Sequence, residues 1–465
     1  MPGLTPATTP GGSPGAAGPT GAASGGAGHS PAAAAGSAGA PSGAAPGSGG
    51  APAITGSRLI PANAQGVTAS QILIGVNLAK PGSGTAAATQ FGAKGISGAD
   101  DTPTVKSIIS YINAHGGVAG RTLAAVFAYT DVTAGSFDQQ AQAACASFTS
   151  DHQVFAVVQQ INDGSAVLPA CLAQHHVALF DEGNSAFYDS QSIGQWAPYY
   201  YSPGRMTLDR MSAQITGLAQ QGYFDKGSRV GVALYDSPSY QRALSHVIRP
   251  ALAAVGFPPT DVYQFSLPSS AAGVSDTAAQ ASNAVLKFRS EGIDHVIFVA
   301  SLGALPFLFL PESESQGYRP RYGFSSSDLP DFQRQNAPAT QLARSIAVGW
   351  NRSADMGALQ TWNDTPASRQ CQAAVRASGV TDLTVAYGVS CDPYFLLQAA
   401  LANAGEVSGA GLRAAMDRLG ASFQMVGPPA TSFGPGLFDG IAGYRDLPFN
   451  AGCDCYRYVG GALSL

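Results

Sequence analysis

The sequence predicts an α/β protein in which two doubly wound lobes follow a disordered tether. From Gln71 onward, short unbroken apolar runs alternate with segments whose apolar residues recur at helical spacing. Unbroken apolar strands joined by helices are typical of parallel sheets that are covered on both faces. Right-handed crossovers make such a sheet doubly wound. Roughly 400 residues follow the tether, which is enough for two lobes of about 200 residues, each with its own core.

The first strand is expected at 72–76, a run of Ile, Leu, Ile, Gly and Val. The first long helix begins at Thr102 as N-cap, with Pro103 at the position where its missing N–H costs nothing. The apolar stripe of this helix ends before Gly116. Later helices are expected near 141–148, 168–175, 208–218, 244–255 and 278–290. Later strands are expected at 122–129, 154–158, 177–180, 230–235, 262–265 and 295–299.

The first 50 residues contain only Gly, Ala, Pro, Ser and Thr, apart from Met1, Leu4 and His29. Such a segment has little to bury, so it cannot offset the ~1–2 kcal/mol per residue that backbone ordering costs. We therefore expect residues 1–68 to form a disordered tether.

Charge and hydropathy exclude two classes of protein. The 24 Lys and Arg residues are outnumbered by 29 Asp and Glu, so a basic surface that follows phosphates is not expected and nucleic acid is excluded as a partner. No apolar run reaches the ~18–20 residues that span a bilayer, so an integral membrane protein is excluded as well.

Polar and small residues follow several predicted strands. Open sheets of this type bind ligands beyond the carboxyl ends of their strands, so these loops form the candidate site. Ser165 also lies where a helix begins, and free N–H groups there could hold an anion. Each of these residues taken alone is equally an ordinary helix cap or turn former. The loops are at 159–165, 181–185, 236–240, 300–303 and 325–328.

Five pieces of sequence, in this order, carry a family resemblance: 72–77 with a Gly-rich loop, 112–121 with its Gly-Gly turn, 230–240, Gly317-Tyr318-Arg319-Pro320, and 392–405. Over about 71–461, the chain resembles the type I periplasmic binding proteins, specifically the branched-chain amino-acid receptors that serve ABC transporters. The resemblance implies two lobes joined by three chain crossings. It places 69–203 and 347–420 in lobe one, and 204–346 and 421–465 in lobe two.

The resemblance also implies that hinge closure traps a solute between the lobes. Ser165 and Asn184 would orient the solute from lobe one, and Tyr240 would cover it from lobe two. Gln241 replaces the glycine that the family has after this tyrosine, and the 301–304 loop lacks the usual carboxylate, for which Asp328 or Asp236 could substitute. The full set of ligand-binding residues expected on this basis is Asn162, Asp163, Gly164, Ser165, Glu182, Asn184, Tyr240, Ser301 and Asp328.

The six cysteines fit disulfides in an exported protein. Cys145 and Cys171 lie on the inward-facing apolar sides of two helices that are expected to be neighbours. They could form a disulfide or remain two inert thiols in the core. Cys371 and Cys391 could close a loop before a long helix. The Cys453-x-Cys455 pair has too few partners for a zinc site, so neither a metal nor another cofactor is expected.

The function expected from the resemblance is capture of a small polar solute, such as an amino acid or an amide, for delivery to the permease of an ABC importer. The alternative is the same fold used as a ligand sensor or a surface-interaction module. No Gly-x-Ser-x-Gly, Walker A or His-Glu-x-x-His motif occurs, so we expect no enzyme. Asp181 and Glu182 could form a catalytic carboxylate pair, but no partner at a suitable spacing can be inferred from the sequence.

Such a receptor is expected outside the cytoplasm, at the cell surface or in the periplasm. No signal peptide follows Met1, because no basic segment or apolar stretch begins there. A leader, or a cysteine that carries a lipid anchor, would then lie outside this chain. Such an anchor would be the only link to the membrane, and the tether would hold the lobes away from the membrane.

Overall fold

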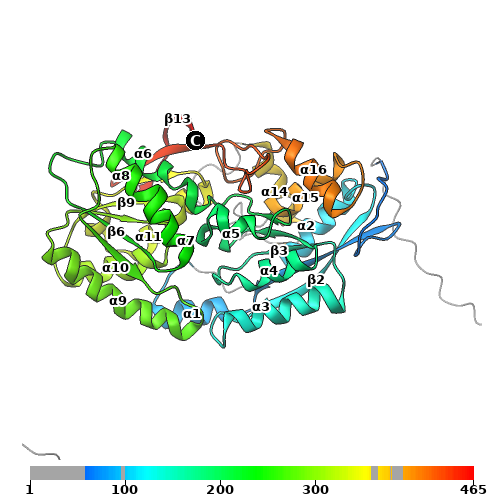
Figure 1. Cartoon of the computed structure of the whole chain (residues 1–465), viewed down its shortest axis with the longest axis horizontal. Coiled ribbons are helices and arrows are strands. Elements are labelled where there is room, and N and C mark those ends of the chain that lie inside the picture. The colour runs from blue at the N-terminus through cyan, green and yellow to red at the C-terminus, as the bar shows by residue number, and fades with distance from the viewer. Residues whose placement is uncertain (1–57, 96–99, 358–364, 378, 380–390) are drawn as a thin grey trace, which may run out of the picture. The chain divides into compact units, whose positions relative to one another are not determined.

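Residues 58–465 are described by a computed structural model, except 96–99, 358–364, 378 and 380–390. They contain two separate sheets (Figure 1). The first has the order β2-β1-β3-β4-β5, and all of its pairs are parallel. The apolar run that predicts the first strand is buried in it, with Ile72, Ile74 and Val76 at 0% exposure. The strands are β1 Gln71–Ala79, β2 Thr122–Thr130, β3 Ala156–Gln159, β4 Ala178–Asp181 and β5 Tyr200–Tyr201.

The second sheet has the order β12-β11-β10-β9-β8-β6-β7, with β13 paired to β11. Strands β6, β7, β8, β9 and β10 of this sheet are parallel. β11 runs antiparallel to β10 and extends the sheet on that side, which the sequence pattern did not predict. The strands are β6 Val230–Tyr235, β7 Asp261–Phe265, β8 His295–Phe298, β9 Arg321–Ser325, β10 Ile346–Gly349, β11 Gly443–Asn450, β12 Cys455–Tyr456 and β13 Val459–Ser464.

Helices connect the parallel strands as predicted. Those of the first half are α1 Ser83–Phe91, α2 Thr102–Ala114, α3 Phe137–Ala146, α4 Val167–Gln174, α5 Ser190–Gly194, α6 Ser212–Gln220, α7 Pro238–Ala243 and α8 Arg249–Ala254. Those of the second half are α9 Ala271–Ser290, α10 Ala304–Ser315, α11 Pro330–Asn336, α12 Ala339–Leu342, α13 Arg352–Met356, α14 Pro366–Arg376, α15 Asp392–Ala402 and α16 Gly409–Leu419. Two π-helical segments, Ser147–Asp151 and Leu244–Ile248, continue α3 and α7, and 3₁₀ turns span Asn184–Phe187, Leu208–Arg210 and Ser326–Asp328.

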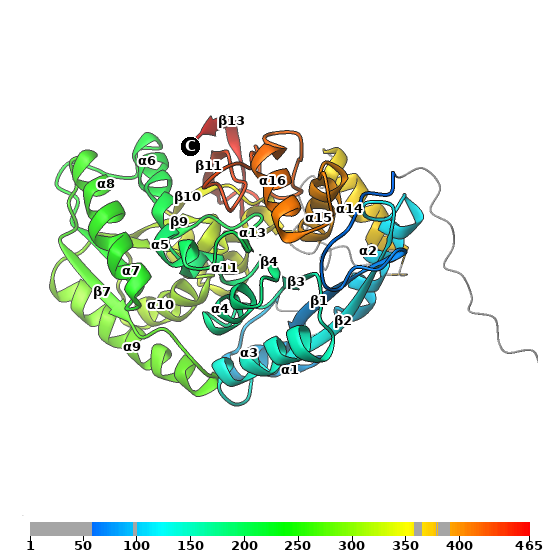
Figure 2. The ribbon, with the colours of Figure 1, turned by 45° about the vertical axis from the view of Figure 1, so that its right-hand side comes forward.

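The two sheets define the two lobes, and the chain passes between them three times. It leaves the first sheet after β5, returns after β10 to form α14 and α15, which lie beside α2 (Figures 1 and 2), and crosses again between α16 and β11. This arrangement confirms the predicted fold class of two α/β lobes. The exact lobe boundaries stay predictions. The boundary expected between residues 346 and 347 falls inside β10, and all four residues of this strand pair in the second sheet.

The tether prediction was wrong for its last residues, because 58–68 pack against lobe one. The Ile60 N–H donates to Ala119 O at 3.3 Å, and the Asn63 N–H donates to Val407 O at 3.2 Å. The buried Arg121 guanidinium donates to Ile60 O and Thr68 O, both at 2.8 Å. A buried cation requires such acceptors, so this arginine fixes the segment in place. Residues 1–57 lie outside the described residues.

Three disulfides are formed, and both predicted pairings are confirmed: Cys145–Cys171 joins α3 to α4, and Cys371–Cys391 links α14 to the residue before α15. The third joins Cys453 to Cys455, whose role the sequence left open. Among the described helices, none combines the length and the apolar character that crossing a bilayer requires.

Candidate functional site

The carboxyl ends of β3 and β4 carry two buried polar atoms that have no hydrogen-bond partner in the described part of the chain. They are Nε2 of Gln159, the last residue of β3, and Oε1 of Glu182, the residue after β4; both side chains are 0% exposed. The other carboxylate oxygen of Glu182 accepts a 2.7 Å bond from Gln160 Nε2. From α15, the Tyr394 hydroxyl reaches Gln160 Oε1 at 3.3 Å. An unsatisfied buried polar atom is costly, so these two atoms are candidates for contact with a bound molecule.

Arg205 lies beside Glu182 on the first crossing between the lobes. Its Nε donates to Glu182 O at 3.0 Å, and the residue is only 8% exposed. Burial lowers the pKa of Arg205, whereas the negative charges of Glu182 and Asp355 raise it. Burial also raises the pKa of Glu182 well above its usual range. Burial thus disfavours the charged forms of both side chains, and their mutual attraction acts against this effect.

Asp355, on α13 of lobe two, lies near Arg205: Asn351, at the start of α13, donates from Nδ2 to Gly204 O at 3.3 Å, and the charges of Asp355 and Arg205 act on each other's pKa. Asp355 Oδ2 accepts from the Ser326 hydroxyl at 2.9 Å, from the Asn351 N–H at 3.1 Å and from the Tyr458 hydroxyl, whereas its Oδ1 has no partner among the described residues. Burial raises the pKa of Asp355 to about 7. We call Gln159, Glu182, Arg205 and Asp355 the interlobe cluster.

The predicted lobe-one residues come together, but they bond one another. Asn184 Nδ2 donates to Asp163 Oδ1 at 2.6 Å, and Asn184 Oδ1 accepts from the Gly164 N–H at 2.8 Å. The Ser165 hydroxyl donates to Asp138 Oδ1 at 2.7 Å, a bond that no sequence pattern indicated. Asn162 is exposed, whereas Glu182 is the one predicted residue that joins the interlobe cluster.

The predicted lobe-two residues form a second internal network. The Tyr240 hydroxyl donates to Ala300 O at 2.5 Å, and the Ser301 hydroxyl donates to Asp328 Oδ1 at 2.9 Å. Asp328 Oδ2 in turn accepts from the Ser325 N–H and hydroxyl, both at 2.9 Å. These side chains are at most 1% exposed. The bonds fix the loops after β8 and β9, and a contact of these residues with solute stays a prediction.

Direct contacts also connect the two lobes. Arg242 of α7 donates to the Asp189 carboxylate, which precedes α5, through both Nε and a terminal nitrogen. Next to this pair, the Ser192 and Ser239 hydroxyl oxygens lie 2.8 Å apart. At another point, Asn336 of α11 exchanges two hydrogen bonds with the backbone of Lys94, at 2.7 and 3.1 Å.

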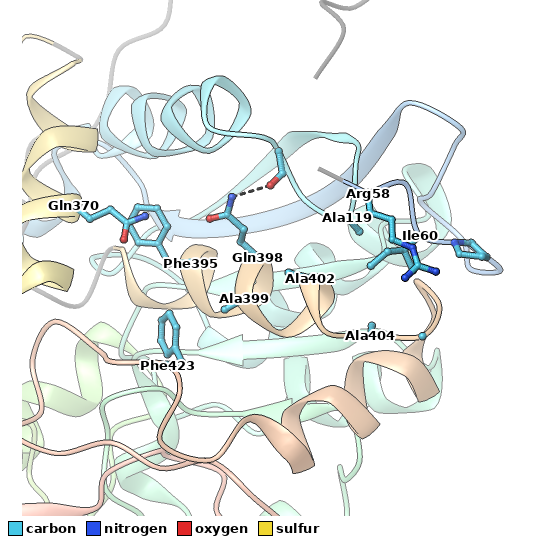
Figure 3. Close-up of a pocket in the computed structure, with 13 residues that line it drawn as sticks. Arg58, Ile60, Ala119, Gln370, Phe395, Gln398, Ala399, Ala402, Ala404 and Phe423 are labelled. Carbon is cyan, nitrogen blue, oxygen red and sulfur yellow. Dashed lines mark hydrogen bonds between the residues drawn. The ribbon is translucent and has the colours of Figure 1, made fainter. Parts of the chain in front are cut away.

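A separate hollow of about 540 Å³ lies in lobe one along α15. Figure 3 shows Gln370 and Phe395 at one end and Arg58 and Ile60 at the other, with Gln398 between them bonded to Gly117 O at 2.8 Å. None of the predicted site residues lines this hollow.

With this geometry established, comparison with known proteins gives the family. A model of the family described as periplasmic binding protein matches residues 86–439. This span begins after β1 and includes the other four strands of the first sheet, β6 to β10 of the second sheet, and every residue of the interlobe cluster. The chain belongs to the periplasmic binding protein family.

Solved periplasmic binding proteins share this fold at low sequence identity. A substrate-binding protein of an ABC transporter from Aeropyrum pernix is 14% identical, with a TM-score of 0.62 over 85% of this chain and 96% of the other. A solute-binding protein from R. palustris in complex with 4-hydroxybenzoate is 14% identical, with a TM-score of 0.59 over 85% and 97%. A branched-chain amino acid ABC transporter protein from Thermus thermophilus with bound valine is 13% identical, with a TM-score of 0.58 over the same shares. The search of curated proteins gave no match.

Three members of the interlobe cluster were missed from the sequence of this periplasmic binding protein. Gln159 is the first residue of the candidate loop at 159–165, but it was not among the expected ligand-binding residues, so its position was a usable signal. Arg205 is a lone cation in a segment that is buried from 200 to 208, which is a second signal. Asp355 follows the last parallel strand by six residues, and only the tertiary fold brings it to the other lobe.

Proposed function

We propose that this chain is an extracytoplasmic solute-binding protein that captures a small polar solute between its lobes and delivers it, chemically unchanged, to the permease of an ABC importer. Membership of the periplasmic binding protein family supports this function and the location outside the cytoplasm. The observation that carries the proposal is the interlobe cluster, where buried and unpartnered polar atoms lie at the carboxyl ends of the first sheet. This is the edge at which open parallel sheets bind ligands.

The cluster offers complementary contacts to a solute that carries both a donor and an acceptor. Glu182 Oε1 accepts a hydrogen bond, Gln159 Nε2 donates one, and the Arg205 guanidinium favours a negative or strongly polar group. Asp355 Oδ1 adds an acceptor from lobe two. An amino acid, an amide or a polar acid of similar size satisfies this set. The structural relatives alone do not choose among these, because one was solved with 4-hydroxybenzoate and another with valine.

Closure would make the solute part of the contact between the lobes. The Arg242–Asp189 and Asn336–Lys94 contacts join the lobes directly. A solute that touches both lobes makes its full set of contacts only when the lobes are closed. It therefore binds the closed state more tightly than the open state, and this difference in affinity shifts the population toward the closed state.

A thermal-shift screen tests the proposal with a panel of amino acids, amides, small organic acids and sugars. A solute present at 100 times its Kd stabilises the folded chain by about 2.7 kcal/mol, so a true ligand raises Tm by several degrees. Glu182→Gln, which keeps the shape and replaces the carboxyl oxygen that accepts a hydrogen bond by an amide group, is expected to weaken binding about tenfold. Asp276→Asn, on the exposed face of α9, is the matched control and leaves Kd unchanged. No response across the panel from folded protein contradicts the proposal.

A further inference from the structure

The Cys453–Cys455 disulfide differs from the other two in both exposure and spacing. Cys453 is exposed, whereas Cys145, Cys371 and Cys391 are at 0%. The bond joins residues only two positions apart, against separations of 26 and 20 for the other pairs. Loop-closure entropy makes a disulfide more stabilising as its loop grows. The Cys453–Cys455 bond is therefore the poorest structural cross-link of the three.

The surrounding turn also has hydrogen bonds that do not involve the sulfur atoms. This turn connects β11 to β12. Within it, Asn450 Oδ1 accepts a hydrogen bond from the Gly452 N–H at 2.8 Å. β12 is anchored by Tyr456, which is fully buried and whose hydroxyl lies 2.6 Å from the Ser345 Oγ. Between the two cysteines, Asp454 has φ +47°, in the left-handed region that a non-glycine residue rarely adopts. Opening the disulfide would relax this residue and leave the anchor intact.

We propose that Cys453–Cys455 is a redox-active site that exchanges with an external dithiol while the two buried disulfides stay closed. A thiolate of the dithiol attacks Sγ of Cys453, the exposed sulfur, and forms a mixed disulfide. The bond to Cys455 breaks, and Cys455 leaves as a thiolate that takes up a proton. The second thiol of the donor then attacks the mixed disulfide and releases Cys453, so two electrons pass to this chain and the donor becomes a disulfide. Exposed disulfides are typically the labile and regulatory ones.

The first test titrates the folded wild-type chain with dithiothreitol, alkylates the free thiols and maps them by peptide mass spectrometry. We expect Cys453 and Cys455 to be labelled together, at a dithiothreitol concentration at least about tenfold below that needed for Cys371 or Cys145. The double variant Cys453→Ser/Cys455→Ser is expected to keep the wild-type Tm to within about 2 °C. Reduction of all three disulfides at one concentration, or of this pair only in denaturant, overturns the proposal.

The second test compares the two single variants and does not depend on the titration. Cys455→Ser leaves Cys453 as the free thiol, and Cys453→Ser leaves Cys455, which is only 7% exposed. With an aromatic disulfide reagent, we expect the first variant to react at least about tenfold faster than the second, because access limits thiol exchange. Equal rates would show that Cys453 is not the point of attack and would overturn the mechanism.

Discussion

Asp189 and Arg242 form a two-armed ion pair between the lobes. Arg242 donates through Nε and, at 2.8 Å, through a terminal nitrogen, and the Asp189 side chain is only 3% exposed. The same carboxylate caps α5 by accepting from the Ser192 N–H at 2.9 Å. Its pKa falls to about 2, because the hydrogen bonds from Arg242 and Ser192 outweigh the effect of burial. One side chain thus begins a helix of lobe one and holds a helix of lobe two.

Replacing this arginine is expected to shift the chain toward an open arrangement of the lobes. Arg242→Gln removes a bidentate, charge-assisted contact and leaves a nearly buried carboxylate without its cation, at a cost of about 1–3 kcal/mol to the closed state. We expect Kd for the solute to rise about tenfold or more and small-angle scattering to give a larger radius of gyration. Arg249→Gln on α8 is the control, because this side chain is exposed and has no hydrogen bond within the described part of the chain. Equal scattering and equal Kd in the two variants would contradict the role of the pair.

Stability is expected to fall as the pH rises from 5 to 8. Burial raises the pKa of Asp163 to about 6, of Asp181, Asp328 and Asp355 to about 7, and of Asp392 to about 8. Unfolded aspartates titrate near pH 4, so between about pH 4 and these values the folded chain holds more protons than the unfolded chain. Raising the pH through this window therefore lowers the free energy of unfolding. Urea unfolding at pH 5 and pH 8 measures the difference, and greater stability at pH 8 would refute it.

Asp392 allows this pH dependence to be assigned to one residue. Both of its carboxylate oxygens accept from the Val426 N–H, at 2.9 and 3.1 Å, and an asparagine keeps one acceptor in that place. Since one pKa unit corresponds to about 1.4 kcal/mol, Asp392→Asn is expected to reduce the loss of stability between pH 6 and pH 8 by about 1–2 kcal/mol. Asp276→Asn, which is exposed, should leave the slope unchanged. An unaltered slope in Asp392→Asn would assign the titration to other carboxyl groups.

The parts of the fold that rest on local apolar pattern were predictable, and those that rest on distant polar contacts were not. β6 was predicted at its exact bounds because its run of six residues is buried on both faces. The packing of 58–68 depends on the Arg121 guanidinium, about 60 residues away, so no local pattern shows it. The candidate loops were found correctly at strand ends. Which of their polar atoms are already bonded depends on long-range contacts such as Ser165 to Asp138, and Glu182 Oε1 is one of the loop atoms without a partner among the described residues.

The Cys371–Cys391 disulfide should contribute measurably to the stability of lobe one. Both residues are fully buried, and the bond closes a loop of 20 residues, for which loop-closure entropy predicts about 3 kcal/mol. Cys371→Ser/Cys391→Ser is expected to lower the free energy of unfolding by about this amount in urea. The Cys453→Ser/Cys455→Ser variant is the matched control, with a loss of about 1 kcal/mol or less because its loop is minimal. Equal losses in the two variants would show that loop length does not govern these cross-links.

Gly183 tests whether the loop after β4 positions the interlobe cluster. A Cβ atom on this residue would lie 1.8 Å from the backbone oxygen of Ile161, so Gly183→Ala must displace one of the two loops that carry the candidate site. The neighbouring Glu182 carboxylate would move with it. Backbone cannot yield as a side-chain tip does, so we expect a loss of about 3 kcal/mol in stability and a rise of at least tenfold in Kd. Gly194→Ala, at an exposed position with no atom within 4 Å of the added Cβ, should leave both quantities unchanged. Wild-type affinity in folded Gly183→Ala would show that the solute does not depend on the geometry of this loop.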